Sequence, residues 1–221
     1  MVETNMDMPL SMVERVLRAH RAPRNNGRPS SPAVARTVRQ PRLAGMTTLY
    51  LMCGLPGTGK TTRAREIAAE HRALRFSPDE WMQPLFGASD PGGMRDVLEG
   101  RLVWTAAELL KVGTAVVLDF GFWGREERAA LHVLARSCGA QAKTVYLSLD
   151  RETQLARIDE RQQRDPDSTW PMLAATLEEW RAMFEVPNER ELAGEVQAAP
   201  SDGQTWREWT AQRWPTALGT P

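Results

Sequence analysis

A glycine-rich segment that directly follows an apolar run constrains this chain more than any other feature. Residues 48–53 have the composition of a buried strand, and residues 54–61, Gly-Leu-Pro-Gly-Thr-Gly-Lys-Thr, match the pattern G-x-x-x-x-G-K-T. The glycines let the backbone curl so that its N–H groups point at an anion, and the helix expected next adds the positive end of its dipole. The segment therefore predicts a loop that binds nucleotide phosphates. A chance glycine-rich turn is the alternative.

The side chains of this loop have separate predicted roles. Lys60 is placed to reach the β- and γ-phosphates, and the hydroxyl of Thr61 is placed to ligate Mg²⁺. The residues expected to bind the nucleotide are Gly54, Leu55, Pro56, Gly57, Thr58, Gly59, Lys60, Thr61 and Thr62. A nucleoside triphosphate with Mg²⁺ is therefore the expected ligand.

Composition excludes several other classes of protein. The 221 residues have a formal net charge of zero, with 42% hydrophobic and 25% charged residues; these values suit a globular domain rather than a disordered or nucleic-acid-coating chain. No run of about 18 apolar residues occurs, and the first residues lack the basic and apolar regions of a signal peptide. The two cysteines, Cys53 and Cys138, cannot form a disulfide framework. We therefore expect a cytoplasmic protein without membrane association.

Residues 1–45 differ from the rest of the chain. They contain eight arginines, three acidic residues and five prolines, for a net charge of +5. We expect one short helix over residues 9–20 and a disordered stretch over residues 23–41. A basic arm of this kind suits nucleic acid or an acidic membrane, but a leader without function is favoured because Met46 stands immediately before the first strand. The expected division is a leader, residues 1–45, and one nucleotide-binding domain, residues 46–221.

From residue 46 onwards, strand-like and helix-like segments alternate. The expected strands are residues 47–53, 73–76, 114–119 and 144–149, and the expected helices are residues 59–71, 78–86, 94–111, 124–137, 151–163 and 171–184. This order predicts an α/β fold with a doubly wound, mainly parallel sheet and right-handed crossovers. Ligands bind such sheets at the carboxyl ends of the strands. The glycine-rich loop, Asp79 and Asp119 all fall at those ends.

The tail of the chain is less regular. Residues 195–199 are expected to add one edge strand. Trp206, Trp209 and Trp214 indicate a terminal segment that packs on the domain.

The residues that accompany the loop narrow the class of nucleotide-binding protein. A GTPase would need an Asn-Lys-x-Asp motif, but no asparagine in the chain is followed by lysine. An ATP-driven motor carries Asp-Glu at the end of a neighbouring strand, whereas here Asp119 is followed by Phe120. Both observations favour a kinase, in which a second substrate accepts the phosphate and no hydrolytic glutamate is needed.

Asp79 is the predicted general base. Residues 77–81, Ser-Pro-Asp-Glu-Trp, follow the second strand. A carboxylate there can take the proton of an acceptor hydroxyl as the hydroxyl attacks the γ-phosphate. One alternative is that Glu80 is the base. The other is that Ser77 caps the helix and the two acids only favour its positive N-terminus.

Asp119 ends a continuously apolar strand beside the loop. We expect its carboxylate to hold Mg²⁺ through water or to bind the acceptor. The aromatic residues of the segment that follows, residues 120–123, are expected either to line an acceptor pocket or to belong to the core. Arg125 and Arg128 are candidates to reach the site, but a solvated helix face is favoured for them.

Three arginines, Arg157, Arg161 and Arg164, follow the spacing i, i+4, i+7 and therefore share one face of a predicted helix. We expect them to form a lid that closes on the phosphates, because an arginine clamp on a transferring phosphoryl group is worth roughly 10³–10⁵ in rate. The alternative is a solvated face with ion pairs to Asp159 and Glu160.

Taken in order, these motifs resemble a known family. Residues 54–61, the Ser-x-Asp-Glu motif of residues 77–80, residues 116–119, the arginine-bearing helix and the Phe-Glu-x-Pro motif of residues 184–187 resemble the P-loop kinases of the AAA_33, zeta toxin, chloramphenicol phosphotransferase and polynucleotide kinase group. The resemblance covers residues 46–191. It implies the three-layer P-loop NTPase fold of nucleotide kinases. By the same resemblance, Lys60 and Thr61 would bind ATP and Mg²⁺, Asp79 would activate the acceptor, and Arg157, Arg161 or Arg164 would belong to the lid.

One position departs from this resemblance. Polynucleotide-type members carry an arginine three residues after the base, where this chain has Met82, and the departure disfavours a polynucleotide acceptor. We therefore expect an ATP-dependent kinase that phosphorylates a hydroxyl group of a small molecule. The alternatives are a nucleotide-binding switch or NTPase that acts on a partner, and a polynucleotide 5′-hydroxyl kinase. The acceptor and the oligomeric state stay open at this point.

Overall fold

The computed structural model describes residues 46–87, 90–164 and 174–219, apart from the side chain of Arg161. All of them belong to one compact unit, Arg42–Pro221. The predicted helix over residues 9–20, the disordered stretch after it and the loop over residues 165–169 lie outside the described residues.

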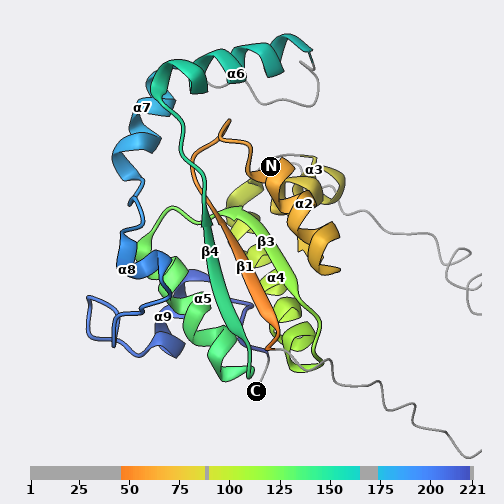
Figure 1. Ribbon diagram of the computed structural model, residues 1–221, viewed down its shortest axis with the longest axis vertical. Coiled ribbons are helices and arrows are strands. Elements are labelled where there is room, and N and C mark those ends of the chain that lie inside the picture. Colours follow the sequence, from red (N-terminus) through yellow and green to blue (C-terminus); the bar gives the residue numbers. More distant parts are fainter. Residues whose placement is uncertain (1–45, 88–89, 165–173, 220–221) are drawn as a thin grey trace, which may run out of the picture. The chain divides into compact units, whose positions relative to one another are not determined.

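Four parallel strands form the centre of this unit (Figure 1). They are β1 (Thr48–Cys53), β2 (Leu74–Phe76), β3 (Val116–Gly121) and β4 (Gln141–Tyr146), in the order β2-β3-β1-β4. Leu49 of β1 pairs with Val116 on one side and with Ala142 on the other. The predicted α/β fold with a parallel sheet is confirmed.

The side chains of β1 alternate between two apolar layers. The helices that cover these layers are α2 (Lys60–His71), α4 (Met94–Lys111) and α5 (Arg125–Ser137). Leu49 and Leu51 pack in the same core cluster as residues of α4 and α5, whereas Tyr50 and Met52 pack with residues of α2. Because both faces of the sheet are buried, as is usual for parallel strands, β1 gives the loop that follows it a rigid base.

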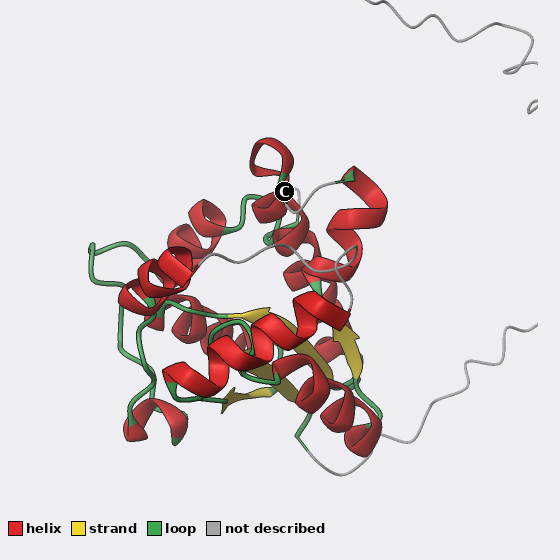
Figure 2. Cartoon of the chain, turned by 90° about the horizontal axis from the view of Figure 1, so that it is seen from above, coloured by secondary structure: helices red, strands yellow, loops and turns green. Residues whose placement is uncertain are grey.

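The remaining elements lie around this three-layer core. They are α3 (Pro78–Phe86), the 3₁₀ turn η1 (Pro91–Gly93), α6 (Arg151–Arg164), α7 (Ala174–Met183), α8 (Glu189–Leu192) and α9 (Trp206–Arg213). Helix α6 lies across the end of the sheet that carries the loop after β1, and α7 and α8 continue beside β4 (Figure 1). Seen from above, α6 crosses over the strands (Figure 2). None of the helices in the described ranges is long and apolar enough to span a membrane.

Strand β4 begins earlier than predicted. It runs over Gln141–Tyr146 rather than residues 144–149, because Gln141 pairs with Thr48 at the start of β1. As an edge strand, β4 needs no continuous apolar run. Gln141 and Lys143 are exposed while Thr144 is buried, so its polar first half carries no apolar signal for a strand.

The predicted edge strand over residues 195–199 is wrong, since the structure has no strand in these residues. Glu126 of α5 instead accepts hydrogen bonds from the side chain of Gln197 and from the backbone N–H of Ser201, which ties the segment to a helix. The predicted docking of the terminal segment is confirmed. Trp214 is fully buried and packs edge-on against Phe122 with ring centroids 6.4 Å apart.

Candidate active site

The glycine-rich loop after β1, residues 54–59, is hereafter the P-loop. Its first residue is fixed to the neighbouring strand, because the N–H of Gly54 donates to the carbonyl of Gly121 at 3.0 Å. Gly54 has φ 144° and Gly57 has φ 81°, values that favour glycine. A β-carbon at Gly54 would lie 2.4 Å from the carbonyl oxygen of Leu147. These two positions therefore need glycine for their backbone angles, and Gly54 also for the close approach of β4.

The side chains of the P-loop hold its curled shape. The ammonium of Lys60 and the hydroxyl of Thr58 each donate to the carbonyl oxygen of Leu55 at 2.8 Å. Helix α2 begins at Lys60, with Gly59 as its N-cap, and Thr61 and Thr62 are exposed in its first turn. All nine predicted nucleotide-binding residues therefore surround one helix N-terminus, where unpaired N–H groups and the helix dipole attract an anion.

Thr61 and Asp119 come together beside the P-loop. Burial raises the pKa of the Asp119 carboxyl, and a side-chain hydrogen bond with Thr61 opposes that rise, as do the charges of Arg75 and Lys60. A hydroxyl and a carboxylate are the hard oxygen donors that suit Mg²⁺, which usually takes few protein ligands and completes its shell with water and phosphate. The pair therefore fits Mg²⁺. Within the described ranges, no group of three or more His, Cys, Asp or Glu side chains could hold a metal alone.

Arg75 of β2 is a site residue that the sequence reasoning missed. Its guanidinium donates to Asp119 Oδ2 at 3.0 Å and also pairs with Glu80, which accepts a further bond from Arg65 at 3.1 Å. The hydrogen bond from Arg75 is the main reason why the pKa of Glu80 lies below its ordinary value. A carboxylate held in this way is a weaker proton acceptor. The available signal was a charged residue placed inside a three-residue strand.

Asp79 occupies the first turn of α3 with a side chain that is 78% exposed. Arg95 of α4 donates to Asp79 Oδ1 at 2.9 Å and to Glu99 Oε1 at 3.0 Å. Ser77 is the N-cap residue of α3, as the alternative reading expects; its backbone carbonyl accepts from the N–H of Glu80 at 3.2 Å, but its side chain makes no capping hydrogen bond. Asp79 is thus a solvent-accessible carboxylate whose cationic partner, among the side chains that the structure describes, is Arg95.

Arg95 is itself held by the core. Its partner Glu99 is buried, and burial raises the pKa of that carboxyl against the opposing charges of Arg95 and Arg213. The indole N–H of Trp214 also donates to Glu99 at 3.2 Å. A connected polar network of this kind fixes side-chain positions. It therefore fixes the guanidinium that faces Asp79.

Helix α6 packs directly on the P-loop. The side-chain amide of Gln154, only 1% exposed, donates to the carbonyl of Pro56 at 2.6 Å and accepts a bond from Arg181 of α7. A β-carbon at Gly57 would lie 3.1 Å from the side chain of Ile158. Neither Gln154 nor Arg181 was predicted as a site residue, because their partners lie 98 and 27 residues away.

Of the three arginines that were predicted to share one face of α6, the structure places Arg157 at the P-loop. A β-carbon at Gly59 would lie 4.0 Å from Nη1 of Arg157, so this guanidinium is beside the P-loop. Arg164 instead forms an ion pair with Glu160 at 2.5 Å, with both side chains mostly exposed. The side chain of Arg161 lies outside the described residues.

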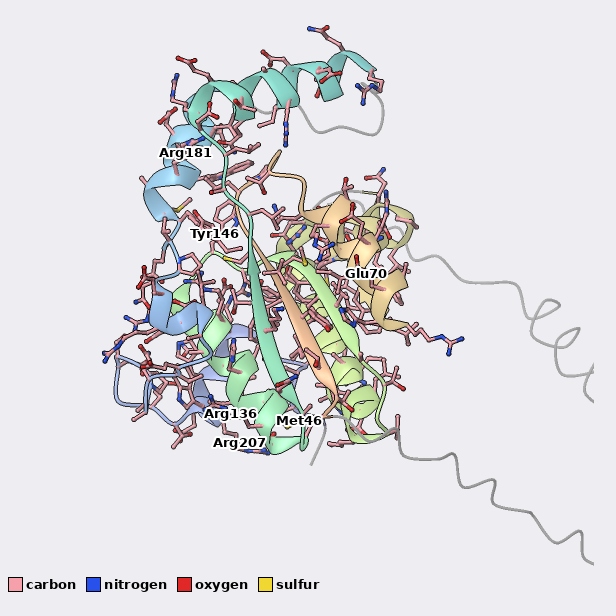
Figure 3. The ribbon with its side chains drawn as sticks, in the orientation of Figure 1. Met46, Glu70, Arg136, Tyr146, Arg181 and Arg207 are labelled. Carbon is pink, nitrogen blue, oxygen red and sulfur yellow. The ribbon has the colours of Figure 1, made fainter. Side chains whose placement is uncertain are left out.

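A pocket of about 120 Å³ opens beside the P-loop. Its lining residues come from the P-loop, the end of β4 and helices α6 and α7, and include Leu55, Thr58, Tyr146, Gln154, Arg181 and Phe184. Tyr146 stacks on Phe184 with ring centroids 6.0 Å apart. Figure 3 shows Tyr146 and Arg181 toward the end of the unit that carries the P-loop. The opposite end carries Met46, Arg136 and Arg207.

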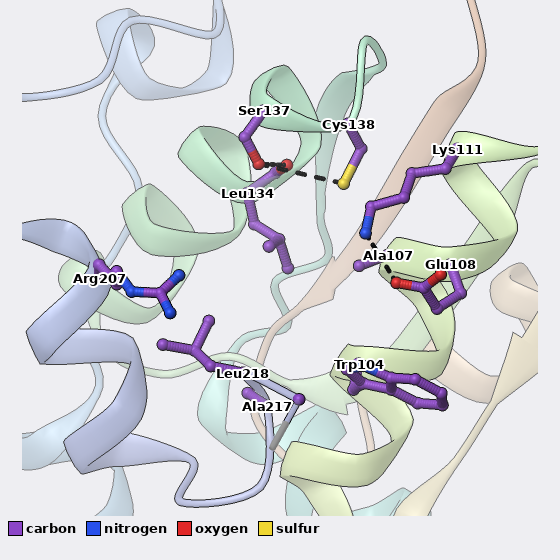
Figure 4. A pocket seen from close by; sticks show the side chains of 11 residues that line it. Trp104, Ala107, Glu108, Lys111, Leu134, Ser137, Cys138, Arg207, Ala217 and Leu218 are labelled. Atoms are coloured by element: carbon purple, nitrogen blue, oxygen red, sulfur yellow. Dashed lines mark hydrogen bonds and ion pairs between the residues drawn. The ribbon is translucent and has the colours of Figure 1, made fainter. Parts of the chain in front are cut away.

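A larger pocket of about 210 Å³ lies between α4, α5 and the terminal segment (Figure 4). Trp104, Lys111, Cys138 and Arg207 are among its lining residues. Lys111 is held by Glu108 at 2.7 Å, and none of the lining residues belongs to the P-loop. Its chemistry therefore does not match the P-loop site, despite its greater volume.

The aromatic segment after β3 belongs mainly to the core. Phe122 is buried and has φ 37°, which is unusual for a bulky residue. Its carbonyl accepts a hydrogen bond from Arg128 at 2.9 Å, and the carbonyl of Trp123 accepts another at 3.0 Å. Trp123 packs against Trp180 of α7, with centroids 5.5 Å apart.

The prediction that Arg128 lies on a solvated helix face is wrong, because this side chain is fully buried. Besides Phe122 and Trp123, it donates to the carbonyl of Glu185 at 2.9 Å and forms an ion pair with Glu191. The turn after β3 points carbonyl groups inward, and buried carbonyls need donors. Arg128 supplies these donors and joins α5, the end of β3 and the segment around α8.

Comparisons with known proteins give the same fold. A family model, AAA_33, with the description "AAA domain", matches residues 49–187. A search of curated proteins found no match. Among solved structures, a chain of the Pnkp1/Rnl/Hen1 RNA repair complex is similar with a TM-score of 0.54 and 20% identity over 65% of this chain. This chain spans 45% of that one.

Two further structures match over their whole length. A protein provisionally described as a kinase from Chloroflexus aurantiacus j-10-fl has a TM-score of 0.54 and 18% identity, covering 79% of this chain and 100% of that one. Kti12 of Chaetomium thermophilum, in complex with ADP-AlF3, has a TM-score of 0.52 and 18% identity, covering 77% and 100%. These likenesses establish the α/β fold of P-loop kinases.

Proposed function

The chain belongs to the AAA_33 family, and we propose that it is an ATP-dependent phosphotransferase that transfers the γ-phosphate to a hydroxyl group of a small molecule. The observation that carries the proposal is the exposed carboxylate of Asp79 at the carboxyl end of the sheet, the end that also bears the P-loop. Asp119 is followed by Phe120 rather than by an acid that would activate water. Residues 46–221 would carry the activity, in the cytoplasm, where ATP is available.

The nucleotide would lie along the P-loop. Its phosphates would contact N–H groups at the end of the P-loop and in the first turn of α2, together with the ammonium of Lys60, and the hydrogen bond from Lys60 to Leu55 would be replaced by one to phosphate. The pocket beside Tyr146 and Phe184 is also lined by Leu55 and Thr58 of the P-loop, which supports binding of the adenosine there. The guanidinium of Arg157 next to Gly59 supports a role on the transferring phosphate.

Thr61 and Asp119 would hold Mg²⁺. When bound, the metal would supply positive charge that offsets the charge of the transferring phosphate. Arg75 orients the carboxylate of Asp119 from the side of β2.

Asp79 would take the proton of the acceptor hydroxyl, with Arg95 fixing the carboxylate on α3. Helix α6 would exclude water from the P-loop through its close packing on Gly57 and Pro56. Arg161 and Arg164 would complete the lid when α6 closes on the phosphates. In this closed form the exposed ion pair of Arg164 with Glu160 would open.

The test is a screen for γ-phosphate transfer from labelled ATP to a panel of hydroxyl compounds, with a water-only reaction and the Lys60→Ala variant as controls. We expect the wild-type protein to transfer phosphate to at least one compound. We expect no transfer in the water-only reaction or with the Lys60→Ala variant. Hydrolysis in water at the same rate with and without every compound would instead indicate a nucleotide switch. Transfer only to the 5′-hydroxyl of an oligonucleotide would indicate a polynucleotide kinase.

A further inference from the structure

We infer that the acceptor carries no anionic group near the hydroxyl that is phosphorylated, so that the site takes a neutral or cationic hydroxyl compound. The inference rests on the proposed function. It concerns the surface around Asp79, formed by the end of β2, the first turns of α3 and α4, and the end of β3; we refer to this surface as the acceptor side.

Every arginine that the structure places on the acceptor side already has carboxylate partners. Arg75 is bound by Asp119 and Glu80, and its side chain is nearly buried. Arg95 is bound by Asp79 and Glu99. An acceptor with a phosphate or carboxylate would have to break one of these pairs and leave a carboxylate without its partner, which is costly.

The remaining arginine, Arg65 of α2, is exposed and bound to Glu80 at 3.1 Å. The buried Glu99 that holds Arg95 is also paired with Arg213, so the charges of the acceptor side are balanced by pairs. An anionic acceptor would therefore meet guanidiniums that already hold carboxylates, and beside them the exposed carboxylate of Asp79. An exposed carboxylate repels an anionic ligand and attracts a cationic one.

Met82 of α3 offers no cationic group to an anionic acceptor. The side chain is 1% exposed and packs with Leu98 and Leu102 of α4. A residue three positions after Asp79 therefore points into the core and away from the acceptor. Any residue at this position would have to displace apolar packing before it could bind a phosphate.

The test compares acceptors that differ mainly in charge. One set is glucose, glucosamine and glucuronate; another is adenosine, adenosine 3′-monophosphate and a 5′-hydroxyl oligonucleotide. We measure kcat/KM for transfer from ATP at one ionic strength. We expect the anionic members of each set to react at least about tenfold more slowly than the neutral member, because like charges at close range oppose binding.

The Glu80→Gln variant tests the cause. It removes one carboxylate, so Arg65 loses its ion pair with Glu80 and Arg75 keeps only its pair with Asp119. We expect the ratio of anionic to neutral kcat/KM to rise about tenfold. Glu108→Gln, which removes an exposed ion pair with Lys111 elsewhere on α4, is the matched control and should leave the ratio unchanged.

The outcomes separate this inference from the proposed function. Two results would overturn the inference that the acceptor is not anionic, while the kinase proposal stands. One is a wild-type protein that prefers the anionic members. The other is a ratio of anionic to neutral kcat/KM that is the same in Glu80→Gln and in the Glu108→Gln control. Release of phosphate to water alone, with no transfer to any member, would overturn the kinase proposal and this inference together.

Discussion

The side-chain amide of Gln154 donates a hydrogen bond to the carbonyl of Pro56 at 2.6 Å, and so joins helix α6 to the P-loop. The other end of the same amide accepts from Arg181 of α7. Because the amide is fully buried, both bonds are shielded from water. The conformation of the P-loop is therefore coupled to the positions of α6 and α7.

We expect Gln154→Met to weaken nucleotide binding by roughly tenfold, because the carbonyl of Pro56 and the guanidinium of Arg181 both lose their hydrogen bond to this amide. The measurement is the Kd of an ATP analogue by calorimetry. Gln163→Met, at an exposed position of the same helix, is the control. A lowered Tm with an unchanged Kd would show that the bond supports the fold alone.

Lys60→Ala should abolish ATP turnover while leaving the protein folded. The ammonium donates a partly buried hydrogen bond to Leu55, and its charge also acts on Asp119, so we expect a loss of about 1–2 kcal/mol in the free energy of unfolding. Turnover is measured as ADP release, and thermal unfolding serves as the stability check. Lys111→Ala, which alters an exposed ion pair with Glu108, should retain activity. Unchanged turnover in Lys60→Ala would contradict the P-loop assignment.

Arg128→Met should destabilise the protein by about 3–5 kcal/mol, because Glu191 would keep a buried charge without its partner. The carbonyls of Phe122, Trp123 and Glu185 would also lose a donor. The measurement is the free energy of unfolding in urea. Arg125→Met on the exposed face of the same helix should change it by no more than about 0.5 kcal/mol. Equal effects of the two substitutions would argue against a structural role for the buried pair.

The two cysteines should differ in their reaction with iodoacetamide. Burial raises the pKa of the Cys53 thiol to about 12, and the charge of Arg128 opposes that rise only in part. Since the thiolate is the nucleophile, Cys53 should stay unmodified in the folded protein from pH 7 to pH 9, while the partly exposed Cys138 reacts. Mass spectrometry of the peptides identifies the modified site. Modification of both residues before unfolding would contradict this assignment.

Cys53 should also lower the stability of the folded protein at alkaline pH. The folded state keeps the proton of Cys53 up to about pH 12, whereas the unfolded state loses it near pH 9. The unfolded state thus binds fewer protons between these values, and stability falls as pH rises through this window. This slope should be smaller in Cys53→Ala than in the wild-type protein.

Local patterns in the sequence predicted most of the fold. Helix α4 was predicted over residues 94–111 and runs over Met94–Lys111, because its apolar spacing and the glycine after it are local signals. The strands before and after it were predicted within a few residues for the same reason. Strand β4 and residues 195–199 were misjudged, since only pairing with β1 or with Glu126 decides where these segments lie.

The candidate site could be predicted only where its residues are neighbours in sequence. Residues 54–62 form one segment, so their shared location follows from the motif. Arg75, Arg95, Arg128 and Gln154 act on partners that are distant in sequence, up to 98 residues away for Gln154. Arg75 alone had a local signal, a charged residue inside a short strand. Only the packing of the helices shows that Arg128 and Gln154 are buried.

Asp79→Asn distinguishes a kinase from a hydrolytic switch. The substitution keeps the size of the side chain and its place in the first turn of α3, so the fold and the affinity for ATP should stay close to those of the wild-type protein. If Asp79 takes the proton of the acceptor hydroxyl, transfer should fall by roughly 10²–10⁴, the usual worth of a positioned general base. ATP affinity and phosphoryl transfer are measured side by side.

Glu80→Gln is the companion variant, because Glu80 is the other candidate base. Its carboxylate is held by Arg75 and Arg65, and the bond from Arg75 lowers its pKa. We therefore expect Glu80→Gln to retain transfer to a neutral acceptor within about tenfold of the wild-type rate. The opposite pattern, with transfer lost in Glu80→Gln and kept in Asp79→Asn, would assign the base to Glu80. If both variants transfer at the wild-type rate, neither carboxylate is the base. Loss of ATP binding in Asp79→Asn would instead make Asp79 part of the nucleotide site and would favour the nucleotide-switch reading.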